Sequence, residues 1–348
     1  MNEFRTLIGD TIERLLADHA TKEVIQAAEE GVWPAALWQA LEENGLTRLM
    51  ASEERGGGGG NWGDAFILLT AQGRHAAPVP LAETLVATWL LDRAGLELPD
   101  GPLTLLTGLT GDGEKASAKV SAKVSGTAKN VPWGNQATHG VAIIGEGAHA
   151  HLALVPLAAA KKTNALNTAR EPRVTCQFDA VTVTIAPVGQ SGAMDLWGAL
   201  MRSCLMAGGL QTLLKASVDY ANERKQFGKP IGKFQAIQQQ LAVLATQTAA
   251  AVAIAGHAAE RASESDDVAF EIAVAKSRID DAVNIATSIS HQVHGAIGFT
   301  YEHTLHLTTR RLWSWRAEFG SGRDWAKRLG RETIERGGDA LWTYVTAR

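Results

Sequence analysis

The spacing of apolar residues changes twice along this chain of 348 residues, and the two changes limit the folds that it can adopt. Residues 1–98 and residues 191–348 carry apolar side chains at helical spacing, as at Ile12 and Leu16. Residues 99–190 instead contain short runs rich in Val and Thr, which favour the strands of a small antiparallel sheet. We therefore predict an α+β chain with an N-terminal helical domain, a middle antiparallel β domain and a C-terminal four-helix bundle.

Glycine and proline divide the helical regions into separate helices. The pattern predicts helices over about 62–74 and 194–223, another from about 301 to 320, and a last one over about 325–346. The run Gly56–Gly60 cannot hold a helix, so we predict a flexible loop there. This run lacks the Lys-Ser/Thr pair of a phosphate-binding loop, which argues against nucleotide binding at this place.

Composition and charge narrow the classes of function. A formal net charge of −4, with 20% charged residues, gives no sign of a nucleic-acid-binding surface. Cys176 and Cys204 are too few for a disulfide framework and favour a reducing cytoplasm. The first 16 residues carry acids inside an amphipathic pattern, unlike a signal peptide, and no run reaches the roughly 18 apolar residues of a membrane span. We predict a cytoplasmic protein that binds neither nucleic acid nor a membrane.

Two motifs in the C-terminal region have the chemistry to bind a dinucleotide. Arg224 follows a predicted helix and precedes a glycine-bearing loop, where its guanidinium can donate two hydrogen bonds to phosphate. Phe227 offers an aromatic face to a ring, and Gln292 offers both a donor and an acceptor. Gly295 and Gly298 would let backbone N–H groups approach an anion without interference from a Cβ atom.

Each of these residues also has an ordinary structural explanation. Arg224 could be a cation that suits the C-terminus of a helix, and Gly295 could be a helix C-cap. Phe227 alone is more often a core residue, and Gln292 alone is more often a surface amide. The histidine pair His291 and His294 invites a metal site, but no cysteine or carboxylate pattern completes it, so we predict no metal.

The motifs around these residues resemble those of the acyl-CoA dehydrogenases. The segment ERKQFGKPIGKFQAIQQQLA, residues 223–242, is similar to the family's R-x-x-F-G loop and the helix after it. The segment HQVHGAIGFTYEHTLHLTTRR, residues 291–311, is similar to the family's Q-x-x-G-G-x-G-[YF] turn. The resemblance implies FAD as the cofactor and the helix–sheet–helix order deduced above.

The resemblance also implies which residues contact FAD, reaching into the flavin site of a neighbouring subunit. The residues implied on the adenosine diphosphate side are Arg224, Gln226, Phe227, Ile231 and Ile237. The residues implied at the ribose and pyrophosphate are Gln292, Gly295 and Ala296.

The carboxylate that acts as general base in this family is missing from both of its usual positions. Acyl-CoA dehydrogenation requires a base to remove the proton next to the thioester. Alignment with the family places Gly320 at one base position and Gly198, on the helix before the Arg224 loop, at the other. Glu318 is an acid close to Gly320, but on a continuous helix its side chain would point to another face. We therefore predict no catalytic residue on this chain.

The middle region also departs from the family. Residues 101–135 lack the T-E-P-x-x-G-S-D-like loop of catalytic members. The stretch KNVPW stands where a K-x-[FW]-I-[ST] strand is expected, so Pro132 and Trp133 replace the usual pair. By this resemblance, the half of the site that would face the flavin ring is eroded, whereas the residues that would reach a neighbour's FAD are kept.

This asymmetry resembles the α2β2 acyl-CoA dehydrogenases of bacterial steroid catabolism, in which only one subunit type carries the base. The resemblance implies a non-catalytic, FAD-binding partner of a catalytic subunit, with the complex desaturating a bulky, steroid side-chain acyl-CoA and passing electrons to an acceptor. Two alternatives stay open: a self-sufficient homotetramer with an atypical base such as Glu318, and a flavin-free structural paralogue.

Overall fold

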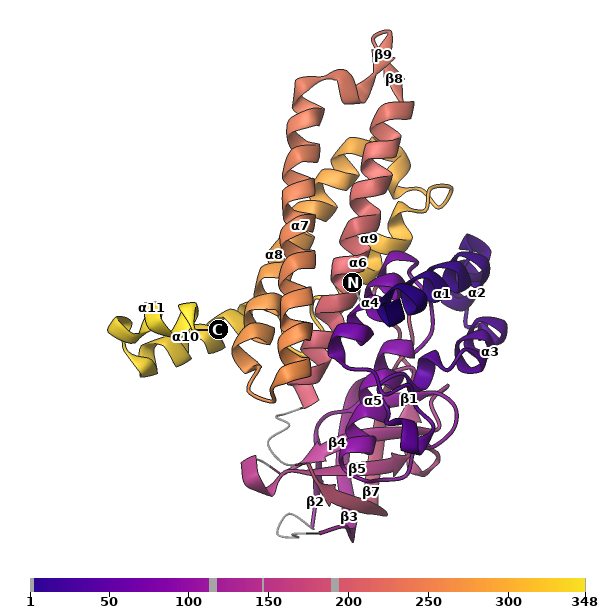
Figure 1. Ribbon diagram of the computed structural model, residues 1–348. Coiled ribbons are helices and arrows are strands. Elements are labelled where there is room, and N and C mark those ends of the chain that lie inside the picture. The colour runs from indigo at the N-terminus through magenta and orange to yellow at the C-terminus, as the bar shows by residue number, and fades with distance from the viewer. Residues whose placement is uncertain (1–2, 113–117, 146, 189–193, 348) are drawn as a thin grey trace.

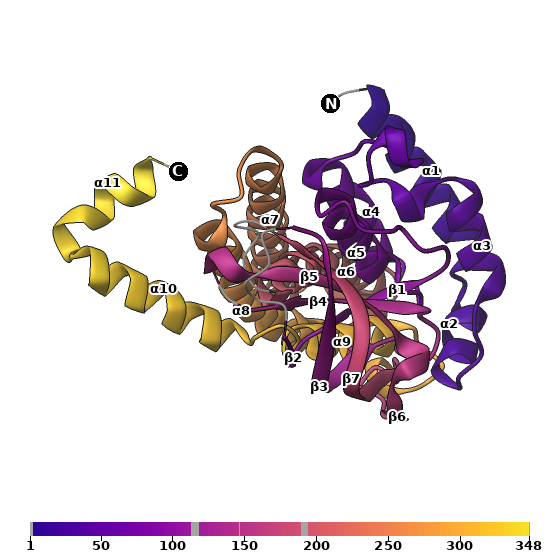
Figure 2. The ribbon, with the colours of Figure 1, turned by 90° about the horizontal axis from the view of Figure 1, so that it is seen from below.

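The computed structural model describes residues 3–112, 118–145, 147–188 and 194–347. A long bundle of helices carries a β-sheet at one end, and the N-terminal helices pack against its side (Figure 1). Viewed along the bundle, the first three helices and the last two lie on opposite sides of the molecule (Figure 2). The predicted boundary at residue 98 falls between the last N-terminal helix and the first strand, whereas the boundary at residue 190 lies outside the described residues.

Five α-helices form the N-terminal region. They are α1 (Glu3–His19), α2 (Lys22–Glu29), α3 (Ala35–Glu43), α4 (Trp62–Arg74) and α5 (Leu81–Arg93). The predicted helix over 62–74 is α4, and it begins with a capping box in which Asn61 and Asp64 satisfy each other's backbone N–H groups. The apolar faces of these helices join one core with the C-terminal bundle, so the two helical regions are packed as a unit.

The five-glycine run is held by hydrogen bonds, which corrects the prediction of a flexible loop. The N–H groups of Gly58 and Gly60 donate to the carbonyls of Arg48 and Leu49 at 3.2 and 2.8 Å. A Cβ atom on Gly57 would stand 2.2 Å from the carbonyl oxygen of Ala51. Glycine is needed because two backbone segments approach closely, and not because the loop must move.

A twisted sheet makes up the middle region. Its strands are β1 (Leu103–Leu106), β2 (Leu109–Gly111), β3 (Val120–Pro132), β4 (His139–Ile144), β5 (His151–Pro156), β6 (Lys161–Thr163) and β7 (Arg173–Pro187). Their order is β1-β4-β5-β7-β3-β2, with β6 also paired to β7. The pairs are antiparallel as predicted, except that β1 and β4 run parallel, because β2 and β3 intervene between them in the chain.

The C-terminal region is a bundle extended by a two-helix arm. Its helices are α6 (Met194–Glu223), α7 (Gln235–Glu264), α8 (Ala269–His294), α9 (Leu305–Trp315), α10 (Gly322–Arg336) and α11 (Leu341–Thr346). The predicted helix over 194–223 is α6, whose 30 residues span about 45 Å. A short hairpin of β8 (Lys225–Gln226) and β9 (Lys229–Pro230) joins α6 to α7.

Two predicted helices were too long. The helix expected over 301–320 is only α9, and turns occupy residues 316–319. The helix expected over 325–346 is divided into α10 and α11, because Gly337 adopts a φ of 85° that a helix does not allow.

One helix, α7, is long and apolar enough to cross a membrane by length and composition alone. The prediction that no stretch is long and apolar enough was therefore wrong for this helix. One face of α7 packs in the bundle, where Leu244, Ala251 and Ala255 are fully buried, and 28% of its most apolar stretch is buried in all.

Candidate functional site

The structure brings the eight predicted cofactor-binding residues together in one cleft at the tip of the bundle. This outer cleft has a volume of about 430 Å³ and is lined by Tyr220, Arg224, Gln226, Phe227, Ile231, Phe234, Ile237, Gln292, Val293, His294, Gly295 and Ala296. Residues from two segments far apart in the sequence therefore face one cavity. The contacts of these residues with FAD stay a prediction.

The hairpin after α6 presents an aromatic ring in an unusual backbone conformation. Phe227 and Gly228, at the centre of the β8–β9 turn, have φ angles of 48° and 78°. Positive φ at both central residues is the mark of a type I′ turn, where Asn-Gly is the favoured pair. A bulky residue with positive φ is strained, and this strain accompanies a ring that is 89% exposed. The ring meets the edge of Phe234 at 6.1 Å between centroids, which holds it beside the cleft.

Arg224 supplies the positive charge of the outer cleft. Its backbone N–H continues α6 by bonding Tyr220 O at 2.8 Å, and its carbonyl accepts from the Ile231 N–H at 2.8 Å. The backbone is therefore fixed at both sides of the residue. Among the described residues, no side chain pairs with the exposed Arg224 guanidinium, which leaves all of its donors free for a phosphate.

The two glycines of the second motif have structural roles, which corrects part of the sequence interpretation. Gly295 ends α8 with a φ of 63°, and its N–H donates to the carbonyl of His291, so this N–H is not free for an anion. A Cβ atom on Gly298 would stand 3.0 Å from both His294 and Leu305. Both glycines lie in a short 3-10 helix, Gly295–Phe299, and the next α-helix, α9, begins only at Leu305.

A second cleft adjoins the outer cleft and was missed at the sequence level. This stacked-ring cleft has a volume of about 480 Å³ and is lined by Thr287, Ser288, His291, Gln292, Gly295, Phe299 and Trp313. It shares Gln292 and Gly295 with the outer cleft. Sequence alone gave no signal for it, because an exposed aromatic residue has the same pattern as a buried one.

A third cavity, the inner cleft, lies between the sheet and the bundle. It has a volume of about 490 Å³, and its lining is Leu105, Thr107, Lys129, Asn130, Pro132, Leu166, Asn167, Thr168, Arg173, Asp195, Trp313, Ser314, Ala317, Glu318, Phe319 and Gly320. Of the pair that replaces the family's usual strand residues, Pro132 lines this cleft. Trp133 is buried instead against Trp33, with ring centroids 6.3 Å apart.

Glu318 is clamped between two arginines at the floor of the inner cleft. Its carboxylate accepts from Arg173 at 2.7 Å and from Arg202 at 2.7 Å. Burial alone would raise the pKa of Glu318, but the two guanidinium charges outweigh it and hold this pKa below its usual range. The expectation that Glu318 lies on a continuous helix was wrong, because α9 ends at Trp315 and Glu318 lies in the turn beyond it.

The turn that carries Glu318 is held from below by a buried lysine. Lys276 on α8 donates from Nζ to the carbonyl of Arg316 at 2.6 Å, which satisfies a free acceptor at the end of α9. Burial lowers the pKa of Lys276 to about 8. Arg316 in turn pairs with Asp280 at 3.0 Å, so α8 fixes both sides of this turn.

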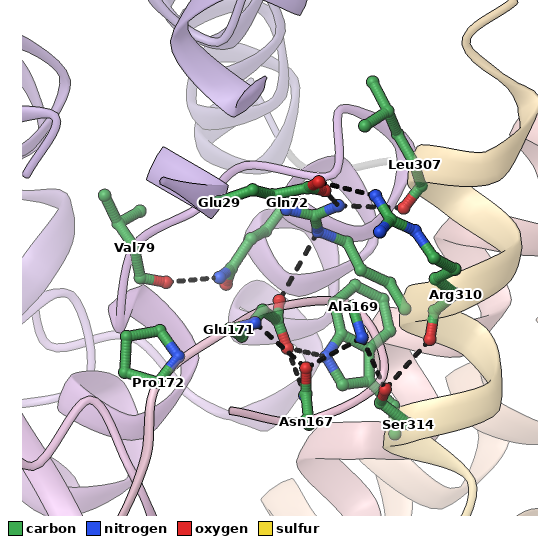
Figure 3. A network of polar contacts seen from close by, with 12 residues as sticks. Glu29, Gln72, Val79, Asn167, Ala169, Glu171, Pro172, Leu307, Arg310 and Ser314 are labelled. Carbon is green, nitrogen blue, oxygen red and sulfur yellow. Dashed lines mark hydrogen bonds and ion pairs between the residues drawn. The ribbon is translucent and has the colours of Figure 1, made fainter. Parts of the chain in front are cut away.

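Glu318 belongs to a continuous network of alternating charges that connects the three regions of the protein. Glu29 on α2 pairs with Arg310 and Arg311 on α9, and Arg311 reaches Glu171 at 3.4 Å (Figure 3). The network continues through Arg173 and Glu318 to Arg202, which pairs with Glu83 on α5 at 2.6 Å. Its members are Glu29, Glu83, Glu171, Glu318, Arg173, Arg202, Arg310 and Arg311. Equal numbers of opposite charges leave the network neutral.

Neither glycine at the two predicted base positions has room for a carboxylate. A Cβ atom on Gly198 would stand 2.2 Å from the ring of Phe319. Gly320 has a φ of 85°, and a Cβ atom there would meet Trp325 Nε1 at 2.8 Å. Phe319 therefore occupies the space beside α6 that a base at position 198 would need.

Asp195 is a carboxylate of the inner cleft that sequence reasoning overlooked. It lies in the first turn of α6, one turn before Gly198, and no described residue forms an ion pair with it. Partial burial raises the pKa of its carboxyl. The sequence could have pointed to Asp195, because it lies three residues before Gly198 and residues three apart on a helix share a face.

Among the described residues, no group of three or more His, Cys, Asp or Glu could hold a metal ion. His294 meets Tyr220 and His303 through its ring, at 4.5 and 4.7 Å between centroids. Burial lowers the pKa of both histidines, so the cluster is an aromatic contact between neutral rings.

Comparison with known proteins agrees with this arrangement. The acyl-CoA dehydrogenase N-terminal domain model matches residues 2–97, and the C-terminal domain model matches residues 196–322. The chain belongs to the acyl-CoA dehydrogenase family. FAD is the cofactor of that family, and a neighbour of known structure, PigA with FAD and proline, has the same fold, with a TM-score of 0.82 at 16% identity.

The relatives of this acyl-CoA dehydrogenase include steroid-type members. Acyl-CoA dehydrogenase IpdE2 of Mycolicibacterium smegmatis is 28% identical over 96% of this chain and 100% of its own length. The Tcur3481–Tcur3483 steroid acyl-CoA dehydrogenase G363A variant has a TM-score of 0.85 and 26% identity, covering 94% of this chain and 97% of that chain. The ChsE4–ChsE5 complex of Mycobacterium tuberculosis shares the fold, with a TM-score of 0.83 at 22% identity, over 95% of this chain and 97% of that chain.

The residues that line the clefts of this acyl-CoA dehydrogenase can be compared with the chemical parts of FAD. The outer cleft fits the adenosine diphosphate half, because it combines a free guanidinium with an exposed aromatic ring. The inner cleft holds the lysine Lys129 at its edge, but Arg173 and Glu318 at its floor neutralise each other. The two clefts therefore differ in what they leave free to bind a ligand.

Proposed function

We propose that this chain is the FAD-binding, non-catalytic subunit of a heteromeric acyl-CoA dehydrogenase, assembled as an α2β2 heterotetramer. The observation that carries the proposal is the contrast between the two clefts. The outer cleft keeps an unpaired arginine and a strained, exposed phenylalanine. Glycine stands at both predicted base positions, Gly320 in the inner cleft and Gly198 on α6, without room for a larger residue at either.

In this proposal the residues of the chain bind and orient, and the base comes from the partner subunit. Bound FAD supplies the acceptor for the hydride that leaves the acyl chain. Arg224 neutralises phosphate charge, and Phe227 covers a flat face of the cofactor at the subunit boundary. Glu318 does not serve as base, because two arginines stabilise its ionised form and occupy both of its oxygens.

The relatives support a bulky acyl-CoA as the substrate of the complex. The Tcur3481–Tcur3483 protein is described as a steroid acyl-CoA dehydrogenase and, like the ChsE4–ChsE5 complex, it joins two differently named chains. By this analogy the complex desaturates a steroid side-chain thioester between its α and β carbons and passes electrons to an electron-transfer acceptor. A cytoplasmic location is part of the same proposal.

The test is a flavin count on the chain alone and with its catalytic partner. We expect the chain alone to bind FAD poorly and the complex to hold about one FAD per heterodimer. Arg224→Ala should weaken FAD about tenfold to a hundredfold, since a charge-assisted hydrogen bond contributes roughly 1.5–3 kcal/mol. Arg323→Ala, an exposed arginine of α10, is the matched control. A homo-oligomer of this chain with stoichiometric FAD and turnover would overturn the proposal.

If this chain is instead a self-sufficient enzyme, Asp195 is a candidate for its catalytic base. It is a carboxylate with a raised pKa in the inner cleft, where a general base would need to stand. If this chain is a complete enzyme, Asp195→Asn should lower turnover at least a hundredfold, whereas the exposed Asp281→Asn should not. If the partner supplies the base, the reconstituted complex keeps its rate of flavin bleaching by acyl-CoA in both variants. A flavin-free paralogue would show no yellow colour with or without a partner.

A further inference from the structure

The segment that joins α8 to α9, residues 295–304, is held by ring contacts with histidines of those two helices. Each contact joins one ring of the segment to one histidine of a flanking helix. The pairs are Phe299 with His291 at 4.3 Å, His303 with His294 at 4.7 Å and Tyr301 with His306 at 5.0 Å between centroids. We call these three pairs the histidine clamp. The segment begins with Gly295 and Ala296, which line the outer cleft, so the clamp holds one edge of that cleft.

The histidines of the two helices each keep a bare ring nitrogen inside the protein. His294 Nδ1 lies 2.7 Å from the carbonyl oxygen of Ser290, and a carbonyl only accepts, so this nitrogen carries the proton. His306 Nδ1 lies 2.7 Å from the carbonyl oxygen of His303 and carries its proton for the same reason. Nε2 of both rings is buried without a hydrogen-bond partner among the described residues, and so is Nδ1 of His291.

This arrangement suits neutral rings and opposes charged ones. A second proton would turn each bare nitrogen into a buried N–H donor without an acceptor, in rings that are only 3% exposed at His294 and 9% exposed at His306. An aromatic face attracts a cation, and Tyr220 stacks on His294 at 4.5 Å between centroids. That attraction is smaller than the cost of burying an unpaired, charged donor.

The charges around the clamp do not compensate for protonation. The titratable and charged groups that surround it are Lys22 and Glu29 of α2, Tyr220 and Arg224 of α6, Glu302 of the segment and Arg310 of α9. Glu29 already pairs with Arg310 at 2.5 Å, and the Glu302 side chain is exposed. Lys22 donates from Nζ to the carbonyl of Glu302 at 3.0 Å, which places a further positive charge beside the segment.

Burial lowers the pKa of all four histidines, and for His294 repulsion from His303 and His291 adds to this effect. In a released segment the same rings would be solvated and would have a pKa of about 6.5. The held segment therefore binds fewer protons than the released one. Its advantage is complete above about pH 6.5 and decreases as the pH falls below that value.

We propose that the histidine clamp is a pH-sensitive switch: neutral rings hold residues 295–304 against α8 and α9, and acid releases the segment and weakens ligand binding in the adjoining outer cleft. The second part of this inference rests on the proposed function, because it takes the ligand to be FAD. The first part concerns only residues of this chain and can be measured without the cofactor.

Hydrogen exchange of the full chain measures release of the segment. The Thr300 N–H, in the middle of the segment, donates to the carbonyl of Ile297 at 3.1 Å and reports opening. Its exchange rate, divided by the intrinsic rate at each pH, gives an opening constant. Each ring that takes up a proton on opening raises this constant by up to about tenfold per pH unit. We expect a rise of at least about tenfold between pH 6.5 and 5.

Two variants and a control identify the groups that take up the protons. His294→Phe and His306→Phe keep a flat ring that cannot be protonated, so each should make the opening constant less dependent on pH. His257→Phe changes an exposed histidine of α7 and should leave the pH dependence as in the wild type. Flavin titration of the reconstituted complex follows the cofactor. The ratio of FAD affinities at about pH 7.5 and 5.5 should be larger for the wild type than for His294→Phe.

The outcomes separate the switch from the proposed function. An opening constant that does not change with pH overturns the inference, and this result needs only the unaltered chain, even if a variant fails to fold. An equal pH dependence in the wild type and both variants overturns it too, since other groups would then take up the protons. Opening in acid without loss of FAD affinity would refute the link to the outer cleft, and with it the inference. If the unaltered complex binds no FAD at neutral pH, the proposed function fails, and the exchange measurement still decides whether the clamp is a switch.

Discussion

The inner and outer clefts of this acyl-CoA dehydrogenase are similar in volume and differ in how their charges are paired. In the inner cleft, Glu318 has a partner for each oxygen, and Gly320 lies against the Trp325 ring. In the outer cleft, Arg224 has no side-chain partner among the described residues and Phe227 is strained and exposed. Positive φ at a bulky residue occurs in both clefts, since Phe319 in the inner cleft has a φ of 54°, so the two clefts differ mainly in how their arginines are paired.

This difference supports the proposed role of the outer cleft as the phosphate-binding site. Strain and unpaired charge persist in a fold only when the surrounding structure holds them, and they gather at functional sites. In the inner cleft, Arg173 and Glu318 belong to a neutral network that joins α2, α5, α6, α9 and β7, whereas Asp195 has no ion-pair partner among the described residues. The comparison leads to four predictions, in order of decreasing effect.

Glu318→Gln should give the largest change, and the change should be in stability. Removing the charge leaves Arg173 and Arg202 buried with one partner fewer, and breaking a buried ion pair costs about 3–5 kcal/mol. Chemical denaturation against Glu335→Gln, an exposed acid of α10, measures the difference. The reconstituted complex should stay active. A hundredfold loss of turnover without a loss of stability would place the base on this chain.

Acid should narrow the stability gap between the wild type and Glu318→Gln. The folded-state pKa of Glu318 lies below its unfolded value of about 4.3, so its contribution is complete above that pH. The contribution is lost as the pH falls through the folded pKa. Denaturation curves should show a constant gap from pH 6 to 8 and a smaller one below about pH 4. A gap that widens in acid would mean that Glu318 is not held ionised.

Gly198→Ala should destabilise the chain by about 1–3 kcal/mol, because the new methyl group would overlap the Phe319 ring and force it to move. Combining it with Phe319→Ala should recover part of that loss, since the double variant removes the clash. Thermal unfolding of the two single variants and the double variant tests the coupling. Strictly additive losses would show that Phe319 does not fill the base position.

Phe227→Gly should have the smallest effect on stability. Unlike the other variants, it should raise stability. Glycine adopts positive φ without strain, so the hairpin should become more stable by up to about 1 kcal/mol. FAD affinity of the complex should fall at the same time, because the exposed ring is removed. Thermal unfolding and flavin titration measure the two effects separately. A variant that loses stability would indicate that the ring is a packing residue.

Sequence predicted the outer cleft better than the inner one, for a physical reason. Arg224 and Phe227 lie within one short motif, and their spacing is kept in the folded hairpin. The ion pairs of the inner cleft join residues far apart in the chain, such as Glu29 with Arg310, and no local pattern marks such partners. The end of α9 was also missed, because residues 316–319 continue the composition of a helix but form turns.

The crossing of α4 and α6 has a consequence for how the chain could be rearranged. A Cβ atom on Gly73 would stand 2.0 Å from Leu205 O, and one on Gly208 would stand 2.0 Å from Thr70 O. The two helices therefore touch backbone to backbone, although they belong to segments that match separate family domain models. A chimaera that exchanged one segment for that of a paralogue would need glycine at both crossing positions, or its halves would be forced apart. Homologous modules in this chain are thus not independent building blocks, and loss of either half should melt the other in a single cooperative transition.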